Sequence, residues 1–293
     1  MSHKTGRRGR RTVAAVAAML VAGGLAAAPL AADATRSGEL RATGLASNGT
    51  KLVRFDTDRP SSVSRSERIA GLSGDSRLIG IDFRVQNGRL YGVGNAGGIY
   101  LIGSGASASK VGQLSVGLTG TNFGVDFNPA ANALRVISDT GQNLRQPFGT
   151  GDAPTGATAA DGTLTYPATP TTPATTATGV TGAAYTNNDL DPDTATTLFD
   201  IDTRLDQVVL QVPANAGTLS PTGKLGIDAG ANAGFDIYST IRDGRTVAVQ
   251  GFATLATNNR YRLYSVNLLT GEVSSRGSFP YAVTDIAIGL NQR

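Results

Sequence analysis

The chain has no cysteine and no tryptophan, and its 293 residues include only one histidine and two methionines. His3, Met1 and Met19 all lie within the first 34 residues, a stretch with the pattern of a removable leader. The rest of the chain therefore lacks a residue essential to Ser-His-Asp and Cys-His nucleophile systems, to His- or Cys-ligated zinc, to iron–sulfur clusters and to attached haem. The enzymatic chemistry left to it is that of carboxylates, a Lys base or an oxygen-ligated metal.

Residues 1–34 have the pattern of an export signal peptide. Four arginines between positions 7 and 11 precede an apolar run at 13–30, and Ala32-Asp33-Ala34 offers an A-x-A cleavage site. We therefore expect a secreted or cell-envelope protein that begins at Thr35 and has no stable membrane span once the signal is removed. The paired arginines also fit a twin-arginine signal loosely, so both export routes stay open.

The basic balance of the full chain comes from this leader. The formal net charge is +4 at pH 7, and the leader holds five of the 26 Lys and Arg but one of the 22 Asp and Glu. The mature chain is thus close to neutral, and its charge gives no sign of a nucleic-acid partner. We expect no nucleic-acid partner and a monomeric protein.

A short strand phrase recurs along the mature chain and predicts its architecture. The copies, typified by Gly-Ile-Asp-Phe, are residues 80–83, 124–127, 182–185, 234–237 and, more weakly, 283–286. They recur every roughly 44 to 58 residues, which suits a four-stranded propeller blade with loop insertions. No long stretch has the 3.6-residue apolar period of a helix. The sequence therefore predicts an all-β fold, a β-propeller of four-stranded antiparallel blades.

The two ends of the mature chain complete each other. Residues 40–56 supply later strands of a blade without the opening phrase, and residues 283–289 supply an opening phrase with nothing after it. Together they would close the ring and remove a sheet edge. Residues 35–293 are thus predicted to form one domain of five blades. Six blades are the alternative, if the Thr/Ala/Pro/Gly-rich insertion at 149–181 hides a degenerate copy; we expect an exposed loop there, in which Leu164 and Tyr166 alone pack.

Aspartates recur within the strand phrase and serve either the fold or a site. Asp82, Asp126, Asp236 and Asp285 fall at equivalent places, around the expected propeller axis. In the interpretation we favour, each accepts backbone N–H bonds and fixes the register of a blade. In the alternative, Asp82, Asp126 and Asp236 converge with Asn122 and Asn128 to hold calcium for a lactonase-like hydrolase.

A second acidic group resembles a calcium loop. Asp189, Asp191, Asp193, Thr197 and Asp200 place oxygens at positions 1, 3, 5, 9 and 12 of a 12-residue loop. The match departs at position 6, where Thr stands in place of Gly, and at position 12, where Asp200 replaces a bidentate Glu. We expect no cofactor, with calcium held by Asp189, Asp191, Asp193 and Asp200 as the alternative.

The densest polar stretch next to a predicted strand runs through residues 138–145. Its amide and guanidinium groups can recognise a hydroxyl- or carboxylate-rich ligand, or they can tie loops together between blades. As a binding site it comprises Asp139, Gln142, Asn143 and Arg145, with Tyr185 and Asn187 from the following blade. The partner expected for such a site is a polysaccharide or a cell-surface protein.

Several of these blocks together resemble the bacterial secreted family known as domain of unknown function 4394. The blocks are residues 79–83 with 88–92, 123–129, 134–145, 183–187, 196–202 and 233–237. The resemblance implies an exported, propeller-like all-β protein, and it brings no catalytic residues. We therefore predict an exported binding or interaction module of the cell envelope or extracellular space, with a calcium-dependent, lactonase-like hydrolase as the alternative.

Overall fold

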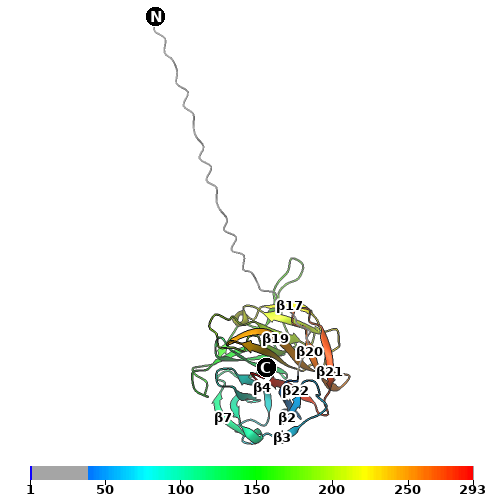
Figure 1. The fold of residues 1–293 in the computed structure, drawn as a ribbon. Helices are drawn as coiled ribbons and strands as arrows, with labels where there is room; N and C mark the ends of the chain where they lie inside the picture. The colour runs from blue at the N-terminus through cyan, green and yellow to red at the C-terminus, as the bar shows by residue number, and fades with distance from the viewer. Residues whose placement is uncertain (2–38, 293) are drawn as a thin grey trace. The chain divides into compact units, whose positions relative to one another are not determined.

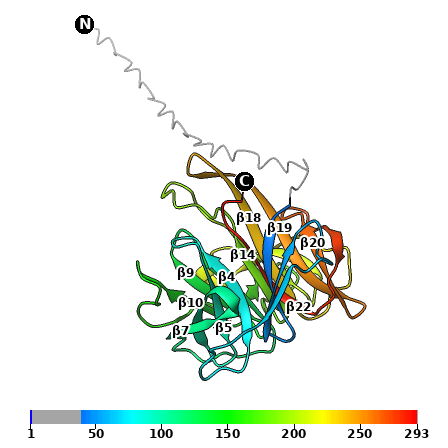
Figure 2. The same ribbon diagram turned by 60° about the horizontal axis from the view of Figure 1, so that its bottom comes forward.

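The computed structural model describes residue 1 and residues 39–292, and the predicted cleavage site lies outside this part of the chain. Within the described residues, the strands form five four-stranded antiparallel sheets and one two-stranded sheet (Figures 1 and 2). We call the four-stranded sheets blades 1 to 5. No helix among the described residues is long and apolar enough to cross a membrane. The predicted all-β propeller with five blades is confirmed.

Each blade runs from an inner strand at the centre to an outer strand at the rim. Blade 1 contains β22 (Val283–Ile288), β1 (Arg41–Ala46), β2 (Lys51–Asp56) and β3 (Arg65–Arg68). Blade 2 contains β4 (Leu78–Arg84), β5 (Arg89–Gly94), β6 (Gly98–Ile102) and β7 (Ala108–Gln113), and blade 3 contains β8 (Phe123–Asn128), β9 (Ala133–Ser138), β10 (Asn143–Pro147) and β11 (Ala159–Ala160). Blade 4 contains β14 (Val180–Tyr185), β15 (Leu198–Asp202), β16 (Gln207–Gln211) and β17 (Leu219–Lys224), and blade 5 contains β18 (Ala233–Arg242), β19 (Arg245–Thr257), β20 (Arg260–Val266) and β21 (Val273–Ser278). Two single 3-10 turns, η1 (Ser104–Ala106) and η2 (Ala214–Ala216), lie in the connections.

The glycine of the recurring phrase lets neighbouring inner strands approach closely. The inner strands contact one another in the order β22, β4, β8, β14, β18 and back to β22. A Cβ atom on Gly124 would lie 2.7 Å from the backbone nitrogen of Ala183 in the next blade, and one on Gly234 would lie 2.4 Å from the Cα of Asp285. A side chain at either position would push two blades apart, so the phrase begins with glycine because the centre of the ring is crowded.

The ring closes through a sheet shared by the two ends of the described chain, as the sequence predicted. The C-terminal strand β22 pairs antiparallel with β1, with Gly44 opposite Ile286 and Ala42 opposite Ile288. Figure 1 shows this red strand beside the blue strands of blade 1. The edge of β1 that faces the centre of the ring is therefore paired, which removes a template for aggregation.

The hydrophobic core lies between blades rather than within them. Each sheet is packed on both faces, so β9 and β14 are buried along their whole length. Between blades 2 and 3, the rings of Tyr91, Phe127 and Phe148 meet edge to face with centroids 5.1 to 5.6 Å apart. Aromatic pairs in this geometry add to the energy of burial alone, so the blade interfaces are the stabilising layers of the fold.

Residues 149–181 contribute more to the fold than the exposed loop we predicted. Ala159–Ala160 form β11, the outer strand of blade 3, and β12 (Thr165–Tyr166) pairs with β13 (Thr175–Thr176). Leu164 is fully buried, and the hydroxyl of Tyr166 donates a 2.5 Å hydrogen bond to Asp202. Strands of two residues are too short to show the alternation by which a strand is recognised in sequence.

Candidate functional site

Three aspartates converge at the centre of the ring. The side chains of Asp82, Asp126 and Asp236 are buried, and each offers an oxygen that lies within 4.8 Å of an oxygen of the other two. Each carboxylate also accepts a backbone N–H from the inner strand of the next blade. The bonds are Phe127 N to Asp82 at 2.8 Å, Tyr185 N to Asp126 at 3.0 Å and Ile288 N to Asp236 at 2.5 Å. These bonds hold successive blades together, which is the role of register brace that the sequence favoured.

Asp285, the fourth aspartate of the pattern, is not equivalent to the other three. Its carboxylate accepts the backbone N–H of Ile81 at 2.8 Å, and its Cα lies where the phrase has glycine in other blades. The residue that corresponds to Asp82 in blade 1 is Ala287, because the next residue, Ile288, donates to Asp236. The predicted alignment was therefore wrong by two residues. A shift of two keeps a side chain on the same face of a strand, so Asp285 still joins the bracing bonds.

Burial of these carboxyl groups raises their pKa. The pKa of Asp82 lies well above its usual value because of burial and the charge of Asp236, and that of Asp126 because of burial and the charge of Asp82. Burial raises the pKa of Asp236 to about 6, against the opposing effect of its backbone hydrogen bonds. Burial likewise raises the pKa of Asp285. The centre of the ring therefore favours protonated carboxyl groups.

We expect the protein to lose stability as the pH rises from 4 to 8. The folded-state pKa of Asp236 is about 6 and its usual value is 3.8, so folding favours the protonated carboxyl group. This contribution to the free energy of unfolding is complete below about pH 4 and is lost as the pH passes 6. The difference between these two pKa values corresponds to roughly 3 kcal/mol of folding free energy. Asp236→Asn keeps an acceptor for Ile288 without the titration, so its melting temperature should fall less over this range. The matched control is Asp243→Asn in the exposed β18–β19 turn, and equal slopes for parent and Asp236→Asn would contradict the assignment.

The hydrolase alternative is not favoured by this geometry. Asn122 and Asn128, the expected partners of the three aspartates, are engaged elsewhere. The side-chain nitrogen of Asn122 donates to Asp139, and the side-chain oxygen of Asn128 accepts the backbone N–H of Ala131. The aspartates themselves are buried and accept hydrogen bonds from the inner strands of neighbouring blades. Their hydrogen bonds therefore connect the blades.

The acidic loop at 189–193 is attached to a hairpin of the next blade. Asp189 accepts both the backbone N–H and the hydroxyl of Thr246, at 2.9 and 2.7 Å, and Asp191 accepts from the guanidinium of Arg245. Asp193 lies 3.7 Å from the same guanidinium. These contacts join the β14–β15 loop to the long β18–β19 hairpin, which Figure 2 shows in side view.

Asp200, the last residue of the predicted calcium set, lies apart from this loop. It sits within β15, is fully buried, and neither carboxylate oxygen has a hydrogen-bond partner among the described residues. Burial raises its pKa well above the usual value, against the opposing charge of Arg135. In the described part of the chain, the sole group of three or more possible ligand residues within 4.8 Å is the central trio. The structure thus does not bring Asp189, Asp191, Asp193 and Asp200 together in such a group.

The six residues predicted to bind a ligand fall into three places. Asp139 and Gln142 lie on the turn between β9 and β10, where Gln142 accepts from Thr119 N and Asp139 accepts from Thr121 and Asn122. Asn143, Arg145 and Tyr185 lie between blades 3 and 4. Asn187 lies in the β14–β15 loop, where its side chain donates to the carbonyl of Ala195.

The group between blades 3 and 4 is organised by a buried arginine, Arg135 of β9. Arg135 is 1% exposed, and its guanidinium donates to Tyr185, Asn143, Asp161 and Asn215 at 2.7 to 3.2 Å. Asn143 is 2% exposed and also donates to the carbonyls of Gly162 and Ala214. Arg145 completes the network through its 3.0 Å ion pair with Asp161. Tyr185 is equally buried, so its ring face lies against protein.

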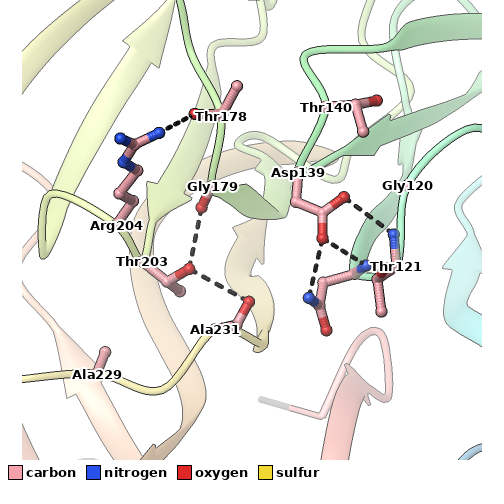
Figure 3. Close-up of a pocket in the computed structure, with 11 residues that line it drawn as sticks. Gly120, Thr121, Asp139, Thr140, Thr178, Gly179, Thr203, Arg204, Ala229 and Ala231 are labelled. Carbon is pink, nitrogen blue, oxygen red and sulfur yellow. Dashed lines mark hydrogen bonds between the residues drawn. The ribbon is translucent and has the colours of Figure 1, made fainter.

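A surface pocket of about 550 Å³ lies where blades 3, 4 and 5 meet (Figure 3). It is bordered by the turns that lead into their inner strands and by the turns that follow β9 and β15. Its lining consists of Gly120, Thr121, Asn122, Asp139, Thr140, Thr178, Gly179, Thr203, Arg204, Ala229 and Ala231. The lining is thus made of small, hydroxyl, amide and charged residues without an aromatic ring. Asp139 is the one predicted site residue that belongs to it.

Hydrogen bonds within its turns hold the pocket in shape. Thr203 donates through its hydroxyl to the carbonyls of Gly179 and Ala231, at 3.0 and 3.3 Å, and so joins the turns that lead into blades 4 and 5 (Figure 3). Gly179 has a φ of +130°, and a Cβ there would lie 2.5 Å from that of Arg204. A wall built from fixed turns loses little conformational freedom when a ligand binds.

Sequence reasoning missed the blade 4 part of this pocket. Thr178 and Gly179 were assigned to the Thr-rich insertion, and Arg204 follows what looked like an ordinary outer strand. The signal that identifies them is the repeat itself: residues 203–206 and 139–142 are both turns after the second strand of a blade. The Asp202-x-Arg204 spacing also marks an Asx turn, since Asp202 accepts the backbone N–H of Arg204 at 2.9 Å.

The fold defines the class of the protein, a five-bladed β-propeller closed by its terminal strands. The chain belongs to the family described as Domain of unknown function (DUF4394), whose family model matches residues 51–287. The predicted resemblance is thereby confirmed at the level of family and fold.

Solved structures with partial similarity come from several kinds of protein. A protein from Lactobacillus plantarum is 15% identical with a TM-score of 0.39, over 85% of this chain and 99% of that one. An auxiliary nutrient binding protein from Bacteroides thetaiotaomicron is 10% identical with a TM-score of 0.43, over 86% and 62%. A chain of a nidogen/laminin complex is 11% identical with a TM-score of 0.45, over 87% and 100%. None of these similarities bears on what this chain binds, and the comparison with curated proteins gave no match.

Proposed function

We propose that the protein is an exported binding module of the cell envelope or extracellular space, and that its ligand site is the pocket between blades 3, 4 and 5. The observation that carries the proposal is the lining of this pocket. Polar side chains from blades 3 and 4 face one hollow, which alanines of blade 5 complete, and these side chains are borne on hydrogen-bonded turns. Loops on a rigid scaffold are where propellers and similar folds place recognition.

The chemistry of the lining selects a polar ligand. Four threonine hydroxyls, one amide, one carboxylate and one guanidinium provide donors and acceptors, and the apolar part consists of alanines. The lining has none of the large apolar and aromatic side chains that sites for a lipid or an aromatic base use. It suits a hydroxyl- or carboxylate-rich ligand such as a cell-wall saccharide.

The proposed ligand is of the predicted kind, but its site is the pocket and not the predicted set of six residues. The network around Arg135 is buried between blades, so Asn143, Arg145 and Tyr185 join these blades and are not part of the pocket lining. Asp139 remains at the pocket edge, where three N–H donors from Thr121 and Asn122 fix it.

Filling the pocket should abolish binding without unfolding the protein. Ala231 lines the pocket and is exposed, and it takes part in the wall through its backbone carbonyl, which any residue retains. In Ala231→Tyr the ring would occupy the hollow, and we expect at least a tenfold loss of retention on an array of neutral and acidic oligosaccharides. The matched control is Ala131→Tyr, in the exposed β8–β9 turn away from the pocket. The proposal would be contradicted if Ala231→Tyr retained saccharides as well as the parent does, or if the parent itself retained none.

A further inference from the structure

The two charged side chains of the pocket are satisfied to very different degrees. The carboxylate of Asp139 accepts three N–H donors at 3.0 Å, from the backbone of Thr121 and from the backbone and side chain of Asn122. Arg204 is exposed, and its guanidinium has one hydrogen-bond partner among the described residues, the uncharged hydroxyl of Thr178 (Figure 3). None of the ion pairs among the described residues includes it. The pocket therefore holds a carboxylate whose oxygens are already hydrogen-bonded and a guanidinium that has no ion-pair partner among the described residues.

Arg204 is also held in place more firmly than an exposed arginine usually is. Its backbone N–H and that of Leu205 both donate to Asp202, at 2.9 and 3.0 Å. Asp202 is 1% exposed and accepts the hydroxyl of Tyr166 through its other oxygen. The guanidinium of Arg204 donates to the hydroxyl of Thr178, on the turn that enters blade 4. The guanidinium thus needs little further ordering to meet a ligand.

We propose that the pocket selects a small carboxylate that also carries hydroxyl groups, the chemistry of a uronic acid, and that Arg204 binds the carboxylate. A guanidinium presents paired N–H donors that match the two oxygens of a carboxylate. The exposed side chain of Thr121 and the side-chain oxygen of Asn122 line the same hollow and can accept hydrogen bonds from hydroxyl groups of the ligand. The inference rests on the proposed function and adds the charge of the ligand to it.

The decisive experiment is calorimetric titration of the protein with galacturonate, with galactose and with polygalacturonate at low ionic strength. We expect galacturonate to bind at least tenfold more tightly than galactose, and to weaken as salt screens the charges. Arg204→Gln should bring galacturonate to the affinity of galactose. Arg242→Gln, at the exposed tip of the β18–β19 hairpin, is the matched control and should leave both affinities unchanged.

The possible outcomes separate the two proposals. Equal affinities for galacturonate and galactose would overturn the inference and leave the binding module standing. No binding of any saccharide would overturn both. Binding of galacturonate supports a free acid as ligand, and binding of the polymer alone supports a residue within an acidic chain. Tight galacturonate binding that survives in Arg204→Gln would overturn the role of this arginine.

Discussion

A protein that lacks residues 283–293 is expected to be unfolded at room temperature. The deletion removes β22, the inner strand of blade 1, and with it the buried side chains of Val283, Ile286 and Ile288. Each contributes about 1.5–3 kcal/mol by burial, and the domain as a whole is stable by about 5–15 kcal/mol. The cut also exposes an edge of β1 and removes the bracing bonds on both sides of blade 1.

Single substitutions distinguish the contribution of β22 from a general effect of mutation. Ile286→Ala should cost about 2–5 kcal/mol, as is usual for a buried isoleucine, whereas Val247→Ala, in the exposed part of β19, should change stability by less than about 0.5 kcal/mol. Both are measured by urea unfolding monitored by circular dichroism. A truncated protein that melts like the parent would show that the ring does not depend on its C-terminal strand.

Removing the buried arginine between blades 3 and 4 is expected to have the second-largest effect. Arg135 donates to four side chains and neutralises part of the charge of Asp161 in a buried setting. Arg135→Met should therefore cost about 3–5 kcal/mol, because it leaves buried acceptors without donors.

An exposed ion pair provides the comparison. Arg245 pairs with Asp191 and Asp193 but is 60% exposed, so Arg245→Met should cost no more than about 1 kcal/mol. Equilibrium unfolding in urea measures both variants under the same conditions. Equal and small effects of the two substitutions would show that the interface between blades 3 and 4 does not depend on its polar network.

The architecture was predictable because repetition amplifies weak signals. One Gly-Ile-Asp-Phe phrase predicts little, but its copies at blade-length intervals predict a ring, and the incomplete ends predict how it closes. The phrase does not fix the position of a residue along its strand, which is why Asp285 was aligned with Asp82 although Ala287 takes that place. Two alignments of this strand that differ by two residues place the same side chains on the same face, so the alternation of residues in the sequence does not distinguish them.

The site was less predictable for a physical reason. Asn143 and Arg145 are polar residues beside a strand, and sequence alone cannot distinguish a solvent-facing ligand contact from an interface bonded to another blade. Arg135, another donor of the same stretch, is the centre of that interface. The pocket is assembled from turns about 60 residues apart in the chain, such as those at Gly120 and Gly179, so its lining emerges only when the blades are side by side.

The claim that this propeller binds its ligand between blades 3, 4 and 5 is tested most directly by amide NMR during titration with galacturonate. We predict that the largest shifts fall on the backbone amides of Gly120, Gly179 and Thr203, which line or border the pocket. Amides of the β14–β15 loop around Asp191, at the other end of blade 4, should not move. Shifts that centre on that loop, or saturable binding without shifts at the pocket, would contradict the account.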